Sequence, residues 1–105
     1  MRHLFVDTSF HVAVFSDADD LHIRAVRLSD ELTQDSATRF VTTEAVLVEF
    51  LTFVRRAGPR ARLGAADYVE ALRLKPGVAI LPHTPELFDA GLDLYRQRPD
   101  KTYSM

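Results

Sequence analysis

The chain has 105 residues, of which 47% are hydrophobic and 27% are charged, and its formal net charge is −2. These are values of one ordinary globular domain, and the lack of a strong positive charge excludes binding to nucleic acid by bulk electrostatics alone. The chain has no cysteine, which excludes disulfides, thiolate metal sites and cysteine nucleophiles. No leader opens the chain and no apolar run approaches ~18 residues, so we expect a cytoplasmic protein with no membrane span.

The predicted elements alternate between strands and helices. Short apolar runs predict strands at residues 3–6, 39–42 and 78–81. Helical spacing and capping signals predict helices at residues 10–15, 21–32, 44–56, 62–74 and 85–98. This alternation is typical of an α/β fold with a parallel sheet and right-handed crossovers, in a single domain spanning residues 1–105.

Two details of burial follow from the same pattern. The strand at 78–81 is apolar at every position, which predicts a sheet that is covered on both faces. In the helix at 62–74, the spacing of Leu63, Ala66 and Val69 predicts that these residues form the buried face.

An acid follows directly after the first predicted strand. Leu4 and Val6 lie in that strand and would carry Asp7 to the carboxyl edge of the sheet. Ligands and metals bind at that edge in open α/β proteins. An Asp after a short strand is also a common turn former or helix cap, so both roles stay open for Asp7.

A second acid lies on the helix predicted at 44–56. The spacing places Glu49 one step away from the solvent face, next to Ala45 and Phe53. A carboxylate among apolar groups is costly unless it reaches water, pairs with a cation, accepts hydrogen bonds or binds a metal. Together, Asp7 and Glu49 would suit Mg²⁺ or Mn²⁺, which prefer hard oxygen ligands together with water and substrate phosphate.

Four short motifs occur along the whole chain. They are residues 4–10 (LFVDTSF), Asp20 and His22 with Ala25, residues 41–49 (VTTEAVLVE) and residues 98–105 (RPDKTYSM). In this order and spacing the chain resembles the PIN domain family. It is most similar to the VapC-like ribonuclease toxins of prokaryotic toxin–antitoxin pairs.

The resemblance implies a three-layer fold, in which a parallel sheet of strand order 3-2-1-4-5 is flanked by helices. It also implies a metal-dependent endoribonuclease that cleaves RNA phosphodiesters with Mg²⁺ or Mn²⁺. Asp7 and Glu49 match the first two catalytic, metal-binding acids, Ser9 matches a hydroxyl residue that supports the first acid, and His22 matches a histidine that packs or caps. An antitoxin partner and a homodimer are expected on the same ground.

The chain departs from the family after residues 101–105. In the family a third acid, a helix, a strand and a fourth acid follow that stretch, and Asp100 does not match the third-acid position. The resemblance therefore implies a C-terminally incomplete domain without its last strands, with weak metal binding and an exposed sheet edge beside the first strand. Four possibilities stay open: a truncated product that is poorly soluble alone, completion by a partner or second copy, an inactive truncated toxin, and a non-catalytic PIN-fold module that retains antitoxin or dimer contacts.

Four arginines surround the predicted turn at residues 58 and 59, namely Arg55, Arg56, Arg60 and Arg62. They either bind RNA phosphates or an acidic partner segment, or they are solvated helix ends. His3, His11 and His83 have no metal-ligand spacing, and the sequence assigns them no role.

Overall fold

The computed structural model of the protein describes residues 2–97, without the side chains of residues 91, 94 and 95. The strands are β1 (Arg2–Phe5), β2 (Thr38–Thr43) and β3 (Val78–Leu81). The helices are α1 (Thr8–Phe15), α2 (His22–Thr33), α3 (Glu44–Val54), the 3₁₀ turn η1 (Arg55–Ala57), α4 (Pro59–Leu74) and α5 (Pro85–Gln97). None of these helices is both long enough and apolar enough to cross a membrane.

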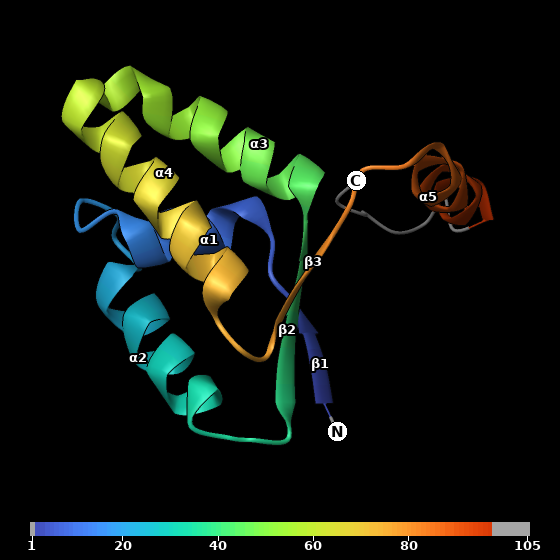
Figure 1. Cartoon of the computed structure of the whole chain (residues 1–105), viewed down its shortest axis with the longest axis horizontal. Coiled ribbons are helices and arrows are strands. Elements are labelled where there is room, and N and C mark those ends of the chain that lie inside the picture. The colour runs from blue at the N-terminus through green and yellow to red at the C-terminus, as the bar shows by residue number, and fades with distance from the viewer. Residues whose placement is uncertain (1, 98–105) are drawn as a thin grey trace.

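The described strands form one parallel sheet in the order β1-β2-β3. The register pairs Phe5 with Val41, and Val41 with Ala79, so the carboxyl ends of all three strands lie at one edge. The parallel α/β fold that the alternation predicted is thus confirmed. Since α1 and α3 each begin directly beyond the end of a strand, their N-termini lie together at this edge (Figure 1).

The sheet is flanked by helices on both sides, but they cover the two faces unequally. Helices α1, α2 and α4 lie on one side, and α5 lies on the other (Figure 1). The prediction that β3 is covered on both faces is wrong, because Ala79 and Leu81 are exposed. The reason is that α5 stands beyond the end of β3 instead of lying across the sheet (Figure 1).

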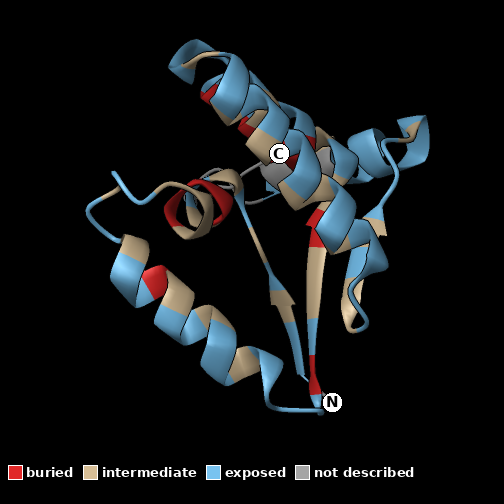
Figure 2. Cartoon of the chain, turned by 60° about the vertical axis from the view of Figure 1, so that its left-hand side comes forward, coloured by how far each residue is buried: buried red, intermediate tan, exposed pale blue. Residues whose placement is uncertain are grey.

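The hydrophobic core lies where α1, α3 and α4 meet. Val12, Phe50, Val54 and Ala65 form its buried cluster. The buried positions gather along these helices and at β2, whereas α2 is mostly exposed (Figure 2). The elements that carry the core are therefore also those that begin at the carboxyl edge of the sheet.

Helix α4 presents only part of the predicted face to the core. Val69 packs against the core cluster, but Leu63 is 70% exposed and Ala66 is exposed as well. Ala65 is instead a member of the buried cluster, and Tyr68 packs against it.

The turn between α3 and α4 depends on a glycine in the left-handed region. Gly58 has φ of 101°, and Pro59 then occupies the first position of α4. Helix α3 ends at Val54, two residues earlier than predicted, because residues 55–57 tighten into η1. Helix α4 starts three residues earlier than predicted, because proline fits the first helical turn.

Candidate functional site

Asp7 is the N-cap of α1 at the carboxyl edge of the sheet. Its backbone is extended, with φ −91° and ψ 178°, and its Oδ1 atom accepts a hydrogen bond of 3.1 Å from the backbone N–H of Phe10. The residue is exposed. The capping role that the sequence left open is therefore real. Because a carboxylate has about four lone-pair sites, it does not exhaust what Asp7 can bind.

The peptide that precedes Asp7 is held on both sides by β2. The N–H of Val6 donates to the carbonyl of Val41 at 2.8 Å, and the carbonyl of Val6 accepts from Oγ1 of Thr42 at 3.0 Å. Although Val6 lies one residue beyond β1, it is thus still tied to the sheet. Asp7 follows a backbone segment with very little freedom.

His11, in α1, is a buried polar side chain close to Asp7 in the chain, and it has two polar partners. Ring nitrogens of His11 lie 2.9 Å from the hydroxyl of Tyr68 and 3.1 Å from Oγ1 of Thr42. His11 is 2% exposed and Thr42 is 1% exposed. Burial lowers the pKa of His11 to about 4, although the negative charge of Asp7 acts in the opposite direction. Burial also raises the pKa of Tyr68 to about 12, so at neutral pH both residues are uncharged.

The sequence analysis assigned no role to these three residues. One signal was available, since His11 and Thr42 are polar residues within predicted apolar elements. That they meet Tyr68 depends on three elements that are far apart in the chain.

Glu49 lies on the exposed side of α3, together with Thr52, Phe53, Arg55 and Arg56, which line a shallow groove. Of the options that the sequence left open for Glu49, the structure shows an exposed side chain that reaches water, and its neighbour Phe53 is itself 65% exposed. Both residues lie on the solvent side of α3, whereas Phe50 and Val54 of the same helix face the core. The ion pairs within residues 2–97 join Arg2 to Asp35 and Arg73 to Glu70, so Glu49 forms no ion pair with Arg56.

Asp7 and Glu49 belong to neighbouring elements. Helices α1 and α3 pack against each other and begin beyond the adjacent strands β1 and β2. Within the described part of the chain, no group of three or more histidine or acidic side chains gathers in one place. Asp7 and Glu49 are thus two exposed carboxylates on adjacent elements, and neither belongs to a larger cluster of such residues within residues 2–97.

The remaining predicted residues take varied positions. Ser9 is exposed in the first turn of α1, and the contact to the Asp7 carboxylate comes from the N–H of Phe10. Nδ1 of His22 lies 2.8 Å from the carbonyl of Ala13, as the packing role that the resemblance implied requires. Asp100 and the motif at residues 98–105 lie outside the described residues.

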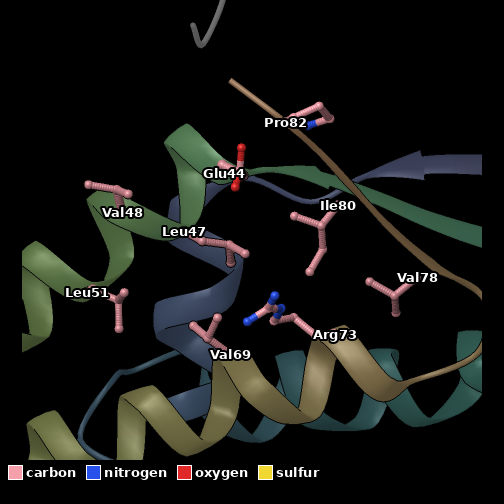
Figure 3. Close-up of a pocket in the computed structure, with 9 residues that line it drawn as sticks. All are labelled: Glu44, Leu47, Val48, Leu51, Val69, Arg73, Val78, Ile80 and Pro82. Carbon is pink, nitrogen blue, oxygen red and sulfur yellow. The ribbon is translucent and has the colours of Figure 1, made fainter. Parts of the chain in front are cut away.

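A second groove, of about 510 Å³, lies between α3, α4 and β3 (Figure 3). Its lining is mostly aliphatic, with Leu47 and Ile80 facing each other across it (Figure 3). Its two charged residues already have partners, because Glu44 accepts from the N–H of His83 at 2.8 Å and Arg73 pairs with Glu70 at 3.2 Å. Glu44 is the single carboxylate among the described residues that line this groove.

Comparison with known proteins agrees with this arrangement. The model of the PIN domain family matches residues 4–103, and the chain belongs to the PIN domain family. This places it in the class of PIN-type endoribonucleases, whose members generally use divalent metal ions.

A solved structure gives a more specific comparison within this class of proteins. The chain is similar to the VapC20 toxin of Mycobacterium tuberculosis, which is described as cleaving the sarcin–ricin loop. The two share 32% identity and a TM-score of 0.70 over 95% of this chain and 72% of the other. A comparison with curated proteins finds no match. The VapC-like, PIN-domain resemblance is thus confirmed, and it implies an RNA substrate and an antitoxin partner in general.

Proposed function

We propose that this protein is a ribonuclease toxin in which Asp7 and Glu49 together bind Mg²⁺ or Mn²⁺. The observation that carries the proposal is the position of Asp7, an exposed carboxylate at the carboxyl edge of a parallel sheet in a PIN domain. Exposed carboxylates suit these ions, which keep several waters and share their coordination with substrate phosphate. The donor set is therefore of the right chemical kind.

The two acids have different tasks in this mechanism. The bond from Phe10 to Oδ1 holds Asp7 in one orientation, and the remaining lone pairs of this carboxylate would be available to hold a divalent cation. Glu49 supplies the second carboxylate from the exposed side of α3, and Ser9 stands beside Asp7 in the first turn of α1. A bound divalent cation lowers the pKa of water and stabilises the charge that develops on a phosphodiester.

The substrate that we propose is structured RNA of the sarcin–ricin type, by analogy with VapC20. Arg55 and Arg56 support this choice, because they are exposed and line the same groove as Glu49. Guanidinium groups bind phosphate with two parallel hydrogen bonds. We propose that they hold the RNA backbone beside the acids, with Arg60 and Arg62 of α4 beyond the turn.

The proposal is tested by cleavage of a sarcin–ricin loop RNA with Mg²⁺ or Mn²⁺, with and without EDTA. Asp7→Asn removes the charge but keeps the helix cap, since asparagine caps as well as aspartate. We expect Asp7→Asn and Glu49→Gln to lower the cleavage rate on the order of 10³-fold. The matched control is Glu31→Gln, at an exposed position of α2.

Cleavage that continues in EDTA, or an Asp7→Asn variant as active as the unchanged protein, would contradict the metal mechanism. Equal losses in Glu31→Gln would show that the effect is one of general charge and not of the two acids.

We further propose that the protein acts in the cytoplasm, as a homodimer, and that a cognate antitoxin neutralises it. These partners follow from its likeness to VapC toxins. Size-exclusion chromatography with light scattering measures the dimer, and a monomer at micromolar concentration would exclude it.

A second candidate is a non-catalytic PIN-fold module that retains its antitoxin or dimer contacts. It is favoured by one observation, that residues 2–97 bring no third acid to Asp7 and Glu49. Calorimetry with Mn²⁺ separates the two candidates. Saturable binding that is lost in Glu49→Gln supports the nuclease, and absence of binding supports the module.

A further inference from the structure

Three side chains, of which His11 and Thr42 are buried and Tyr68 is partly buried, form a continuous line of hydrogen bonds that ends at the peptide before Asp7. The line runs from the Tyr68 hydroxyl to His11, from His11 to Thr42, and from Thr42 to the carbonyl of Val6. Its members come from α4, α1, β2 and the end of β1. The line therefore connects α4, α1 and β2 to the segment that directly precedes Asp7.

The positions of the protons in these hydrogen bonds can be assigned by starting from the carbonyl of Val6, which is the final acceptor. A carbonyl only accepts, so the hydroxyl of Thr42 must give its single proton to Val6. Oγ1 of Thr42 can then only accept from His11, which places the imidazole proton on Nε2. Nδ1 of the neutral ring is consequently an acceptor, and the Tyr68 hydroxyl donates to it. All bonds point the same way, and each donor proton has one acceptor.

Aromatic rings pack against this line, and a small cavity borders it at His11, Thr42 and Tyr68. Phe50 is fully buried, and its ring centre lies 6.0 Å from that of His11 and 5.2 Å from that of Tyr68. No buried side-chain nitrogen or oxygen in the described part of the protein lacks a hydrogen-bond partner. Because an unmade hydrogen bond at a buried side chain is costly, we expect His11 and Thr42 to keep these hydrogen-bond partners.

His11 also holds Asp7 through its backbone. Its N–H donates to the carbonyl of Asp7 at 3.3 Å, while the N–H of Phe10 donates to the Asp7 side chain. The peptide before Asp7, its own carbonyl and its carboxylate are therefore each anchored. The first anchor depends on the Thr42 hydroxyl, which the His11 side chain orients, whereas the other two are made by backbone N–H groups in the first turn of α1.

We infer that His11, Thr42 and Tyr68 are positioning residues that set the metal affinity of Asp7 through the Val6 peptide. The inference rests on the proposed function, in which Asp7 is a ligand. Mutation of residues that orient a metal ligand typically lowers metal affinity or activity 10- to 100-fold.

The test compares Thr42→Val, which keeps the shape but removes the hydroxyl, with Thr42→Ser, which restores it. Mn²⁺ binding to the full chain is measured by calorimetry, and folding is checked by circular dichroism. We expect Thr42→Val to bind Mn²⁺ about 10- to 100-fold more weakly, and Thr42→Ser to bind within about threefold of the unchanged protein.

Thr38→Val is the matched control for a merely structural effect. Thr38 is buried on the same strand, but it lies at the opposite end, where its hydroxyl donates to Asp35. We expect Thr38→Val to lower stability without changing the affinity for Mn²⁺. The inference is wrong if Thr42→Val behaves like Thr38→Val.

Hydrogen exchange gives a readout that needs no metal. The amides of Phe10 and His11, which donate to Asp7, should exchange about tenfold faster in Thr42→Val and keep their rates in Thr38→Val. If the unchanged protein binds no Mn²⁺, the proposed function fails, while these exchange rates still support or overturn the positioning role. Unchanged rates in Thr42→Val would overturn it.

Discussion

The inner and outer sides of α3 differ sharply in their environment. Phe50 faces the core and is fully buried against His11 and Tyr68, whereas Phe53, less than one turn later, is 65% exposed beside Glu49. The acid at the end of β1 is thus supported by a close-packed, fully hydrogen-bonded interior. The acid on α3 stands in a solvated groove with two arginines. We interpret the first region as the fixed part of the site and the second as its adaptable, substrate-facing part.

The largest expected effect contrasts the two phenylalanines of α3. Phe50→Ala should lower the free energy of unfolding by about 3–5 kcal/mol, because it opens a cavity at the centre of the core. Phe53→Ala should change it by only about 0.5 kcal/mol, because its ring is largely in water already. Urea unfolding followed by circular dichroism measures both. Similar losses in the two variants would contradict the described orientation of α3.

The next effect is a loss of stability in mild acid that originates at His11. The pKa of His11 is about 4 in the folded protein, against the ordinary value of 6.5 in an unfolded chain, so between these pH values the unfolded chain binds a proton that the folded chain does not. Stability is therefore complete above pH 6.5 and falls as the pH drops toward 4, by about 3 kcal/mol in total.

Urea unfolding at pH 7, 6, 5 and 4 measures this loss. His11→Gln removes the titrating group and should flatten the curve in this window, even where the variant is less stable at pH 7. A wild-type curve that is already flat between pH 6.5 and 4 would refute a buried, neutral His11.

The smallest effect belongs to the arginines of the groove. With EDTA present, so that the RNA stays intact, Arg55→Ala together with Arg56→Ala should weaken RNA binding. The slope of log K against log salt should become shallower by about 1.4 to 1.8, as expected when two phosphate contacts are lost. The matched pair is Arg24→Ala with Arg27→Ala, which removes the same charge from the exposed surface of α2. Equal slopes in both double variants would show that the groove is not part of the RNA path.

Much of the fold was predictable from local patterns. The apolar runs before Asp7 and around Val41, and the hydroxyl cap at Thr43, place β1, β2 and α3 within about two residues of their observed bounds. The Gly58–Pro59 pair marks the end of one helix and the start of the next. These signals are local, because they arise from backbone preferences and capping bonds within a few residues.

The errors arose where burial depends on distant elements. Spacing along α4 is consistent with more than one apolar face, and only the packed structure shows that Ala65 is buried while Leu63 is exposed. The apolar composition of β3 suggested two covered faces, but the position of α5 leaves Ala79 and Leu81 exposed. Periodicity gives the faces of an element, and packing decides which of them is covered.

The sequence by itself determined the parallel α/β order, the family resemblance and the location of Asp7 after the first strand. Only the tertiary structure decided that Glu49 is solvated, and that His11, Thr42 and Tyr68 join in one line of hydrogen bonds that ends at the peptide before Asp7. The physical reason is that strands and caps form from neighbouring residues. A hydrogen-bond line between residues up to 62 positions apart exists only after the chain has packed.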